Sequence, residues 1–418
     1  MTAEIITIGD ELLIGQVINT NQAFIAERLQ SVGITIQRML TVGDNEEEIL
    51  GSFAEGLSAH DVIVVTGGLG PTHDDVTRAA VCKFFNTDLI VNEQALHRIT
   101  ELFRRRGIPL IQLNEDQALV PRDCTVIQNS QGTAPGYLFE REGRYCIVMP
   151  GVPFEMKAMM DEFVIPYFAE RRTGGVIRHK TLKTTGIGES ILANQIGAVA
   201  PLLAPHPGVT LAFLPSPTGV RLRITAKGIN PGDVDQAIQQ VEDGLRAKAE
   251  KFIYGVDDEE LEEVVGKLLL ERRLTISIAE SCTGGLIADR FTNVPGSSSY
   301  FERGVIAYSN ASKVTMLQVP LSLLDAHGAV SKEVAEAMAA GIRTVSKTSI
   351  GLSTTGIAGP TGGTGEKPVG LVWIGYSDAQ GTLAIKFHFG EDRRRVKERA
   401  AQAALELVRR KLLKIDHR

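Results

Sequence analysis

Short apolar runs alternate with segments of helical periodicity at both ends of this chain, and this alternation restricts the possible folds more than any other feature. Near the N-terminus the β-rich runs span residues 3–8, 34–42 and 61–66, and the segments between them repeat apolar side chains at helical spacing. Strands joined by helical crossovers run parallel, so this order predicts a parallel sheet with helices on both faces.

The C-terminal part has the same pattern. A helix that begins with acidic residues is expected over 257–270. Apolar runs follow at 274–279, 304–308, 350–355 and 371–376, and a basic amphipathic helix comes after them. The segment between the two stretches combines strand-like and helical runs, which is typical of a small α+β module.

The length of the chain fits this division. At about 100–200 residues per domain, 418 residues correspond to two or three domains. We therefore expect an α/β protein with a doubly wound domain over residues 1–170, a small α+β connector over 171–254 and a second α/β domain over 255–418.

Composition limits the partners and the compartment. A formal net charge of -6 and 6% aromatic residues give no reason to expect a nucleic-acid surface. No apolar stretch approaches the roughly 18 residues of a membrane span, and the N-terminus lacks the pattern of a signal peptide. The four cysteines form no CxxC pair and no zinc-ligand spacing, which fits a reducing compartment. We expect a cytoplasmic protein that binds neither nucleic acid nor membrane.

A glycine-rich loop follows the third apolar run. Its sequence, TGGLGPTHDDVT over 66–77, lets the backbone turn tightly and brings free N–H groups of the next helix toward an anion. Its two adjacent aspartates suit a divalent cation that bridges phosphates. A glycine turn before a capped helix, without a ligand, is the alternative interpretation.

Polar residues also follow the earlier strands. Asp10 and Glu11 come after the first run, Asn19 and Asn21 open the first helix, and Asp44 follows the second run. Carboxyl ends of parallel strands lie along one edge of a sheet, where folds of this class bind ligands. Packing gives no reason for polar residues at three successive strand ends, so we expect a ligand site there.

The motifs over 1–170 resemble the molybdopterin-binding domain, and more narrowly the N-terminal domain of the competence/damage-inducible CinA proteins. The matching strings are GDELLIG, NTN, GGLGPTHDD, GTAPG and MPGVPFEM. The resemblance implies an ADP-ribose pyrophosphatase that depends on a divalent metal ion such as Mg, Mn or Co. The string that follows the glycines, Pro71-Thr72-His73, departs from molybdopterin adenylyl-type domains, so molybdopterin is a less expected ligand.

The resemblance also implies roles for particular residues of this domain. Metal binding or the orientation of water falls to Asp10, Asp44, Asp74 and Asp75. Substrate binding falls to Gly67, Gly68 and Gly70, which would cradle the pyrophosphate, and to Asn21. Residues 171–254 resemble the KH-type module of CinA proteins; Gly186-Ile-Gly188 makes no convincing phosphate clamp, so a structural or dimerising role is favoured over RNA binding.

A second glycine-ended loop, ESCTGG over 280–285, lies between a predicted strand and a helix. A hydroxyl or thiol there sits at the positive end of the helix, and the backbone N–H groups near Gly284 and Gly285 could form an oxyanion hole. An ordinary helix N-cap is the alternative interpretation. Further hydroxyls, one lysine and an arginine cluster follow other strands in YSNASK, STTGIAGP and DRRR. No histidine or carboxylate is placed as a base, but a desolvated lysine can act as one.

Residues 255–415 resemble the CinA C-terminal domain, the nicotinamide mononucleotide deamidase family. The matching strings are ESCTGG, VPGSSSYF, GVIAYSNASK, TGIAGPTGG and KPVGLVW. The resemblance implies hydrolysis of the carboxamide of nicotinamide mononucleotide to nicotinate mononucleotide and ammonia without a metal, in a homodimer. It assigns Ser281 as the nucleophile or its partner, and Lys313 as the base.

The remaining roles follow from the same resemblance. Tyr308 and Thr355 would polarise or position the amide, and Ser298 and Arg395 would bind phosphate or ribose. Cys282 is a competing nucleophile, although its side chain should point to the opposite face. Three hypotheses stay open: a two-enzyme fusion, a deamidase whose N-terminal domain only binds a nucleotide or molybdopterin, and a competence-related scaffold without activity.

Overall fold

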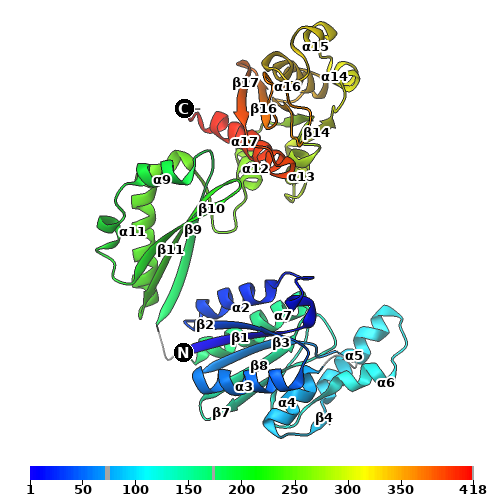
Figure 1. Cartoon of the computed structure of the whole chain (residues 1–418), viewed down its shortest axis with the longest axis vertical. Coiled ribbons are helices and arrows are strands. Elements are labelled where there is room, and N and C mark those ends of the chain that lie inside the picture. Colours follow the sequence, from blue (N-terminus) through cyan, green and yellow to red (C-terminus); the bar gives the residue numbers. More distant parts are fainter. Residues whose placement is uncertain (71–75, 172–174, 417–418) are drawn as a thin grey trace. The chain divides into compact units, whose positions relative to one another are not determined.

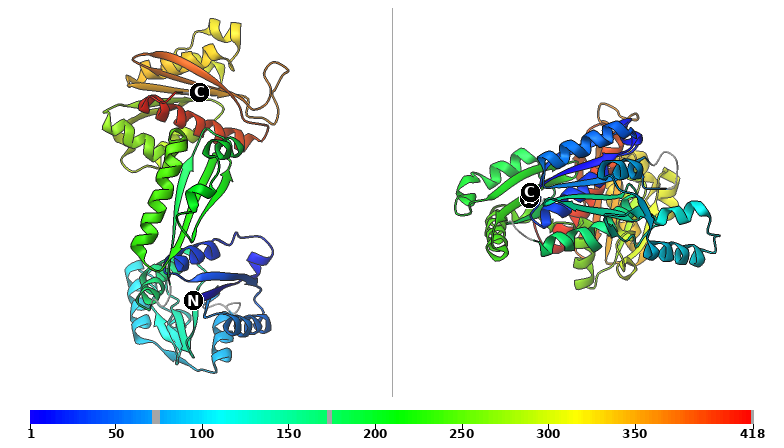
Figure 2. Two further views of the ribbon diagram at one scale, coloured as in Figure 1. Left: turned by 90° about the vertical axis from the view of Figure 1, so that its left-hand side faces the viewer. Right: turned by 90° about the horizontal axis from the view of Figure 1, so that it is seen from below.

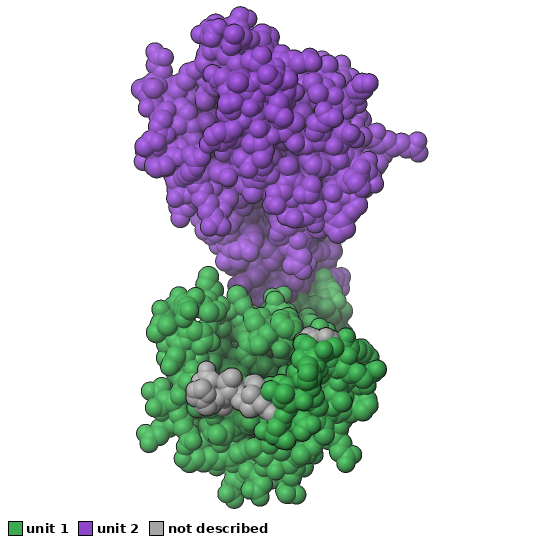
Figure 3. Space-filling model, turned by 90° about the vertical axis from the view of Figure 1, so that its right-hand side faces the viewer, with its two compact units in different colours: residues 1–178, 226–235 green, residues 179–225, 236–418 purple. Residues whose placement is uncertain are grey.

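The computed structural model describes residues 1–70, 76–171 and 175–416. The chain divides into two compact units, each coloured separately in Figure 3. The first comprises residues 1–178 and 226–235, and the second comprises residues 179–225 and 236–418.

The first unit is built on a six-stranded sheet with the strand order β2-β1-β3-β8-β7-β6 (Figure 1). Its strands are β1 (Thr2–Ile8), β2 (Thr35–Val42), β3 (Val62–Gly67), β6 (Thr125–Ile127), β7 (Gly136–Arg141) and β8 (Arg144–Pro150). The first four strands in this order run parallel, which confirms the predicted parallel sheet. β7 and β6 add an antiparallel edge. The turn between β7 and β8 has positive φ at Glu142 and Gly143, as a two-residue hairpin requires.

Helices cover both faces of this sheet. One apolar cluster joins the sheet to α2 (Thr20–Ser31) and α7 (Pro153–Met159), and another joins it to α3 (Glu46–Ala59) and α4 (Thr77–Phe85). Neighbouring residues of β1 alternate between the two clusters, so the strand is buried on both sides. The remaining elements are α1 (Asp10–Leu13), β4 (Leu89–Val91), α5 (Glu93–Arg106), α6 (Gln112–Glu115), β5 (Leu119–Pro121) and α8 (Ile165–Glu170).

The middle segment forms a four-stranded sheet with the order β10-β11-β9-β12. Its elements are β9 (Val176–Thr184), α9 (Glu189–Ile196), α10 (Ala200–Leu203), β10 (Val209–Ser216), β11 (Gly219–Gly228), α11 (Pro231–Ala249) and β12 (Ile253–Val256). This is the small α+β arrangement that the sequence predicts.

The C-terminal sheet has the order β14-β13-β15-β16-β17. Its strands are β13 (Ile276–Glu280), β14 (Phe301–Ile306), β15 (Ile350–Gly356), β16 (Leu371–Asp378) and β17 (Gly381–His388). β14, β13 and β15 are parallel, and β16 and β17 are antiparallel. Figure 2 shows this sheet between two layers of helices.

The two helical layers bury different apolar clusters. On one face lie α12 (Leu261–Glu271), α13 (Leu286–Thr292) and α17 (Arg393–Leu413). On the other lie α14 (Asn310–Leu317), α15 (Leu321–His327) and α16 (Lys332–Ser346). Among the residues described, no helix has both the length and the apolar character needed to cross a membrane.

One predicted boundary is wrong in a way that matters for the site. The sequence pattern extends a strand to Tyr308, but β14 ends at Ile306. Ser309 then caps α14 by accepting a hydrogen bond from the backbone N–H of Ser312. Lys313 is therefore fixed on a helix and does not project from the end of a strand.

Candidate active site

The carboxyl ends of β13, β14 and β15 meet at one edge of the C-terminal sheet. The backbone N–H of Ser281 donates to the carbonyl of Thr354 at 3.0 Å, and the N–H of Ala307 donates to the carbonyl of Glu280 at 2.8 Å. These bonds extend the strand ladders by one residue and hold the loop after β13 between its two neighbours. Residues that are far apart in the sequence thus surround Ser281.

The side chain of Glu280 holds this loop in place through hydrogen bonds to its backbone. Its buried carboxylate accepts hydrogen bonds from three backbone N–H groups, those of Gly285 at 2.9 Å, Ile287 at 3.2 Å and Ala288 at 2.8 Å. The N–H of Gly284 donates to the carbonyl of Ser281 at 3.2 Å. Both glycine N–H groups are therefore occupied, so an oxyanion hole near Gly284 and Gly285 would have to use other backbone N–H groups of this loop. Both have positive φ, 64° and 96°, which explains why glycine is needed there.

Ser281 contacts a buried lysine. The ammonium nitrogen Nζ of Lys313 lies 3.2 Å from Ser281 Oγ, and it donates to the carbonyls of Ala307 at 2.8 Å and Tyr308 at 3.4 Å. Only 1% of the surface of Lys313 is exposed. In the described part of the chain, no carboxylate pairs with it. Burial lowers the pKa of Lys313, because a charged amine without a counter-ion is poorly solvated there.

Cys282 faces away from this pair. It is buried in the apolar cluster on the α13 and α17 face, whereas Ser281 bonds to a lysine on the α14 face. Burial raises the pKa of the Cys282 thiol to about 12. The protonated thiol is a weak nucleophile, so the geometry favours Ser281 over Cys282.

The other two predicted catalytic residues, Thr355 and Tyr308, lie next to residues that contact the pair: Thr354 bonds to Ser281, and Ala307 bonds to Lys313. The Thr355 hydroxyl is buried and donates to the carbonyl of Ala329 at 2.7 Å, so it ties the loop before α16 to the end of β15. Tyr308 is 60% exposed, and its hydroxyl accepts a hydrogen bond from Arg393 at 2.9 Å. Tyr308 therefore lies on the rim of the site, within reach of α17.

Two cations of α17 reach this rim, and neither of them is the predicted Arg395. Arg393 also donates to the carbonyl of Gly359 at 2.7 Å, and Lys397 Nζ lies 3.3 Å from the position that a Cβ on Gly284 would occupy. Arg393 and Lys397 share a helix face because they are four residues apart, whereas Arg395 is about 200° around the helix from Arg393. Arg393 and Lys397 are therefore the cations of α17 that reach the rim of the site, and the sequence had not singled them out. Two cations four residues apart at the start of a helix, here Arg393 and Lys397, are the signal in the sequence that could have identified them.

Ser298 is also separated from the site. It is exposed in a short 3₁₀ turn (Ser297–Ser299) that precedes β14. The start of β14 pairs with Ile276 at the start of β13, so Ser298 lies at the amino edge of the parallel strands. Ser281 lies at the carboxyl edge. Within one chain, Ser298 is therefore not brought to the site around Ser281, and its binding of phosphate or ribose stays a prediction.

The predicted ligand residues of the first unit also gather at a carboxyl edge. Asp10 and Asp44 each accept the backbone N–H of the other, at 3.2 and 3.0 Å, so their carboxylates lie close together. Asp74 and Asp75 lie outside the described residues. Among those that are described, no group of three or more His, Cys, Asp or Glu side chains could hold a metal ion.

Asn21 lies at the same edge. Its amide nitrogen donates to the carbonyl of Gly151 at 2.7 Å, and the N–H of Gly151 donates to the carbonyl of Gly67 at 2.9 Å. The Asn21 side-chain oxygen is buried and has no hydrogen-bond partner among the described residues. Gly68 and Gly70 follow half-buried at the end of β3. The arrangement leaves a polar acceptor beside the glycine loop.

Three family models match the chain. The CinA C-terminal domain matches residues 258–412, the Probable molybdopterin binding domain matches 4–170, and the Damage-inducible protein CinA KH domain matches 179–255. The structure of a CinA protein of unknown function from Thermoplasma acidophilum is 37% identical over 39% of this chain and 95% of that chain, with a TM-score of 0.36.

Relatives match over the whole length. A CinA-like protein from Chloroherpeton thalassium is 48% identical over 98% of this chain and 99% of its own length. A protein named as competence-damage inducible from Caldicellulosiruptor saccharolyticus is 43% identical over 99% of this chain and 100% of its own length. With identity at this level across all three regions, the chain belongs to the CinA family.

Proposed function

We propose that the C-terminal site hydrolyses the carboxamide of nicotinamide mononucleotide to nicotinate mononucleotide and ammonia. The observation that carries this proposal is the contact between Lys313 Nζ and Ser281 Oγ, because a buried amine with a lowered pKa is a suitable base for a serine hydroxyl. The cations Arg393 and Lys397 at the rim suit the phosphate of a mononucleotide. The direct test is ammonia release from this substrate by the full chain in the presence of a chelator.

The first half-reaction transfers the acyl group to the enzyme. Neutral Lys313 accepts the hydroxyl proton of Ser281 as Oγ attacks the carboxamide carbon, and the carbonyl electron pair moves to oxygen. In the described part of the chain the backbone N–H groups of Cys282 and Thr283 donate to no other residue, so they are free to stabilise this oxyanion. The carbon–nitrogen bond then breaks, and Lys313 returns the proton to the leaving nitrogen, which departs as ammonia.

The second half-reaction regenerates the serine. A water molecule attacks the ester carbon while Lys313 accepts one of its protons. The ester bond breaks, the proton passes to Ser281 Oγ, and the product carboxylic acid ionises. None of these steps needs a metal.

The pH dependence of kcat/KM should report Lys313. The base must be unprotonated, so the rate should rise with pH through the pKa of Lys313, which burial places below the ordinary value of about 10.4. The substrate phosphate also titrates, with a pKa of about 6. Nicotinamide riboside lacks that group and should show the same acidic limb. A profile with no limb below the ordinary lysine pKa would argue against Lys313 as the base.

Phosphate recognition distinguishes the two faces of α17. Lys397→Met should raise the KM for nicotinamide mononucleotide by about ten- to a hundred-fold, because one charge-assisted hydrogen bond is lost. It should leave the reaction of nicotinamide riboside nearly unchanged. Arg395→Met is the matched control and should alter neither substrate. Equal effects of both variants would contradict the assignment.

We further propose that the first unit is a metal-dependent ADP-ribose pyrophosphatase. The neighbouring carboxylates of Asp10 and Asp44 offer hard oxygen ligands, which Mg and Mn prefer, and the unpartnered oxygen of Asn21 offers an acceptor to a ribose hydroxyl. A bound metal would neutralise pyrophosphate charge. Asp74 and Asp75 remain proposed ligands on the resemblance alone.

This second activity predicts a selective loss. In Asp10→Asn the full chain should lose ADP-ribose cleavage by about a hundred-fold or more, because a metal ligand and its charge are removed. Ammonia release from nicotinamide mononucleotide should be unaffected. Product analysis with and without added Mn measures both. Metal-independent cleavage, or no cleavage by the wild type with any divalent ion, would favour a unit that only binds a nucleotide.

A further inference from the structure

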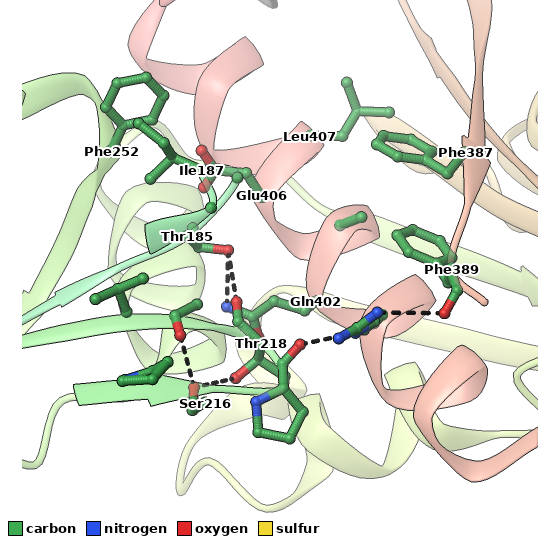
Figure 4. A pocket seen from close by; sticks show the side chains of 18 of the residues that line it. Thr185, Ile187, Ser216, Thr218, Phe252, Phe387, Phe389, Gln402, Glu406 and Leu407 are labelled. Atoms are coloured by element: carbon green, nitrogen blue, oxygen red, sulfur yellow. Dashed lines mark hydrogen bonds between the residues drawn. The ribbon is translucent and has the colours of Figure 1, made fainter. Parts of the chain in front are cut away.

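A cavity of about 550 Å³ lies within the second unit, away from Ser281. Its walls come from the loop before α9, the turn between β10 and β11, strand β17 and the later turns of α17 (Figure 4). Ligand pockets of proteins have about 300–1,000 Å³, so the cavity is large enough for a small molecule.

Most of the lining is apolar and aromatic. Phe387 lies on β17 and Phe389 lies just beyond the end of that strand; their ring centroids are 5.3 Å apart and their planes are inclined by 11°, and Phe252 lies on the other side of the cavity. The two rings are stacked, so they form one continuous aromatic surface. Flat apolar walls of this kind suit a ring system.

Two arginines of α17 supply positive charge at the wall. Arg399 is held by the carbonyls of Pro217 at 3.1 Å and Phe389 at 3.3 Å, through Nε and Nη1. Its second terminal nitrogen, Nη2, donates to no group in the described part of the chain. The guanidinium is thus fixed while one of its ends stays available.

Arg410 is arranged in the same manner. It is 6% exposed and donates through Nε to Glu406 at 2.6 Å and through Nη1 to the carbonyl of Asp416 at 2.9 Å. Its Nη2 lies 3.2 Å from the position of a Cβ on Gly186, so glycine leaves it access to the cavity. Glu406 is shared with Arg409, so this buried cluster of two cations and one anion keeps a positive charge.

We propose that this cavity is a second small-molecule site, which takes a ligand with a flat aromatic body and one anionic group, a phosphate or a carboxylate. The aromatic walls hold the body, and Arg399 and Arg410 hold the anion. Two carboxylates also line the cavity: Glu189 is exposed to solvent, and Glu406 is shared by Arg409 and Arg410. The buried part of the wall therefore keeps a positive charge, which is costly without an anion, so an anionic ligand complements the site. The proposal does not depend on the reaction assigned to Ser281.

The test uses two fluorescent probes with the full chain. 8-Anilinonaphthalene-1-sulfonate has aromatic rings and an anion, and N-phenyl-1-naphthylamine has the same rings without the charge. The wild type should bind both. Arg399→Met should weaken the sulfonate by about ten-fold and leave the neutral probe unchanged, because only a charge-assisted contact is removed.

Two further variants complete the comparison. Ala403→Phe places a ring in the cavity and should abolish binding of both probes, with thermal unfolding measured to show that the protein is folded. Arg394→Met, an exposed arginine paired with Glu398, should bind as the wild type does. Sulfonate binding that survives both Arg399→Met and Ala403→Phe in folded protein would overturn the proposal. Equal loss of both probes in Arg399→Met would overturn the anionic role.

Displacement identifies the source of the anion. Adenosine monophosphate and 1-naphthoate are each added to the wild type with bound sulfonate probe. Displacement by the nucleotide indicates a phosphate ligand, and displacement by naphthoate alone indicates a carboxylate. Displacement by neither, at concentrations far above that of the probe, would overturn the assignment of an aromatic anion.

Discussion

Replacing Lys313 by methionine is expected to lower kcat for ammonia release from nicotinamide mononucleotide by about a thousand-fold or more, while the protein stays folded. General-base catalysis contributes about 10²- to 10⁴-fold, and among the described residues no other base contacts Ser281. Methionine keeps the length and apolar stem of lysine, so packing is largely preserved. Steady-state kinetics with a chelator measure the loss.

Stability provides an independent readout of the same substitution. Because the pKa of Lys313 is lowered in the folded protein, the unfolded chain binds more protons between that lowered pKa and the ordinary one. The free energy of unfolding should therefore fall as the pH is lowered through this window, and below the lowered pKa the full penalty remains. In urea unfolding, Lys313→Met should not show this pH-dependent fall in the free energy of unfolding. Lys332→Met, on the exposed start of α16, is the control and should keep it.

Ser281→Ala should match Lys313→Met in activity, and the double variant should be no worse, because the two groups act as one unit. Turnover retained by Ser281→Ala but lost in Lys313→Met would move the attack to a water molecule. Turnover retained by both would refute the proposed site.

The second large effect concerns stability at Glu280. Glu280→Gln should lower the free energy of unfolding by about 2–4 kcal/mol. In the wild type both carboxylate oxygens accept backbone N–H groups, whereas in the variant the NH₂ of glutamine would lie against one of these donors and could not accept its hydrogen bond. The loop that carries Ser281 would be displaced, so activity should fall as well. Urea unfolding and kinetics measure the two losses.

The matched control for this change is Glu302→Gln, an exposed carboxylate on β14 of the same sheet. It should alter stability by no more than about 0.5 kcal/mol. Comparable stability of the two variants would show that the three hydrogen bonds of Glu280 contribute little.

Much of the fold follows from periodicity, because buried strands such as β3 and β13 read as uninterrupted apolar runs. The antiparallel edge of the first sheet was not predicted, since Glu142-Gly143 is a weak turn signal compared with Asn-Gly. The pairing of Ser281 with Lys313 could be expected from the resemblance, but not from their spacing.

The errors at the site have a common physical cause. A motif specifies which residues are present. Their place in the site depends on which face of a helix they occupy and at which end of a strand they lie. Ser298 belongs to a matching string and Arg395 to the DRRR cluster, yet Arg395 faces another side of α17 than Arg393 and Ser298 precedes its strand. The Gly285 N–H donates to Glu280, because a buried carboxylate needs donors, and the Gly284 N–H donates to the carbonyl of Ser281.

The last helix, α17, connects the middle sheet to the C-terminal sheet. Arg409 donates to the carbonyls of Lys251 and Ile253, and Gln402 donates to Thr185, while the apolar face of the helix completes the core against β13 and β16. Segments that share one buried helix lose their packing together. Residues 179–225 and 236–416 should therefore unfold as a single cooperative block, so the KH-like module is not expected to unfold before the C-terminal domain.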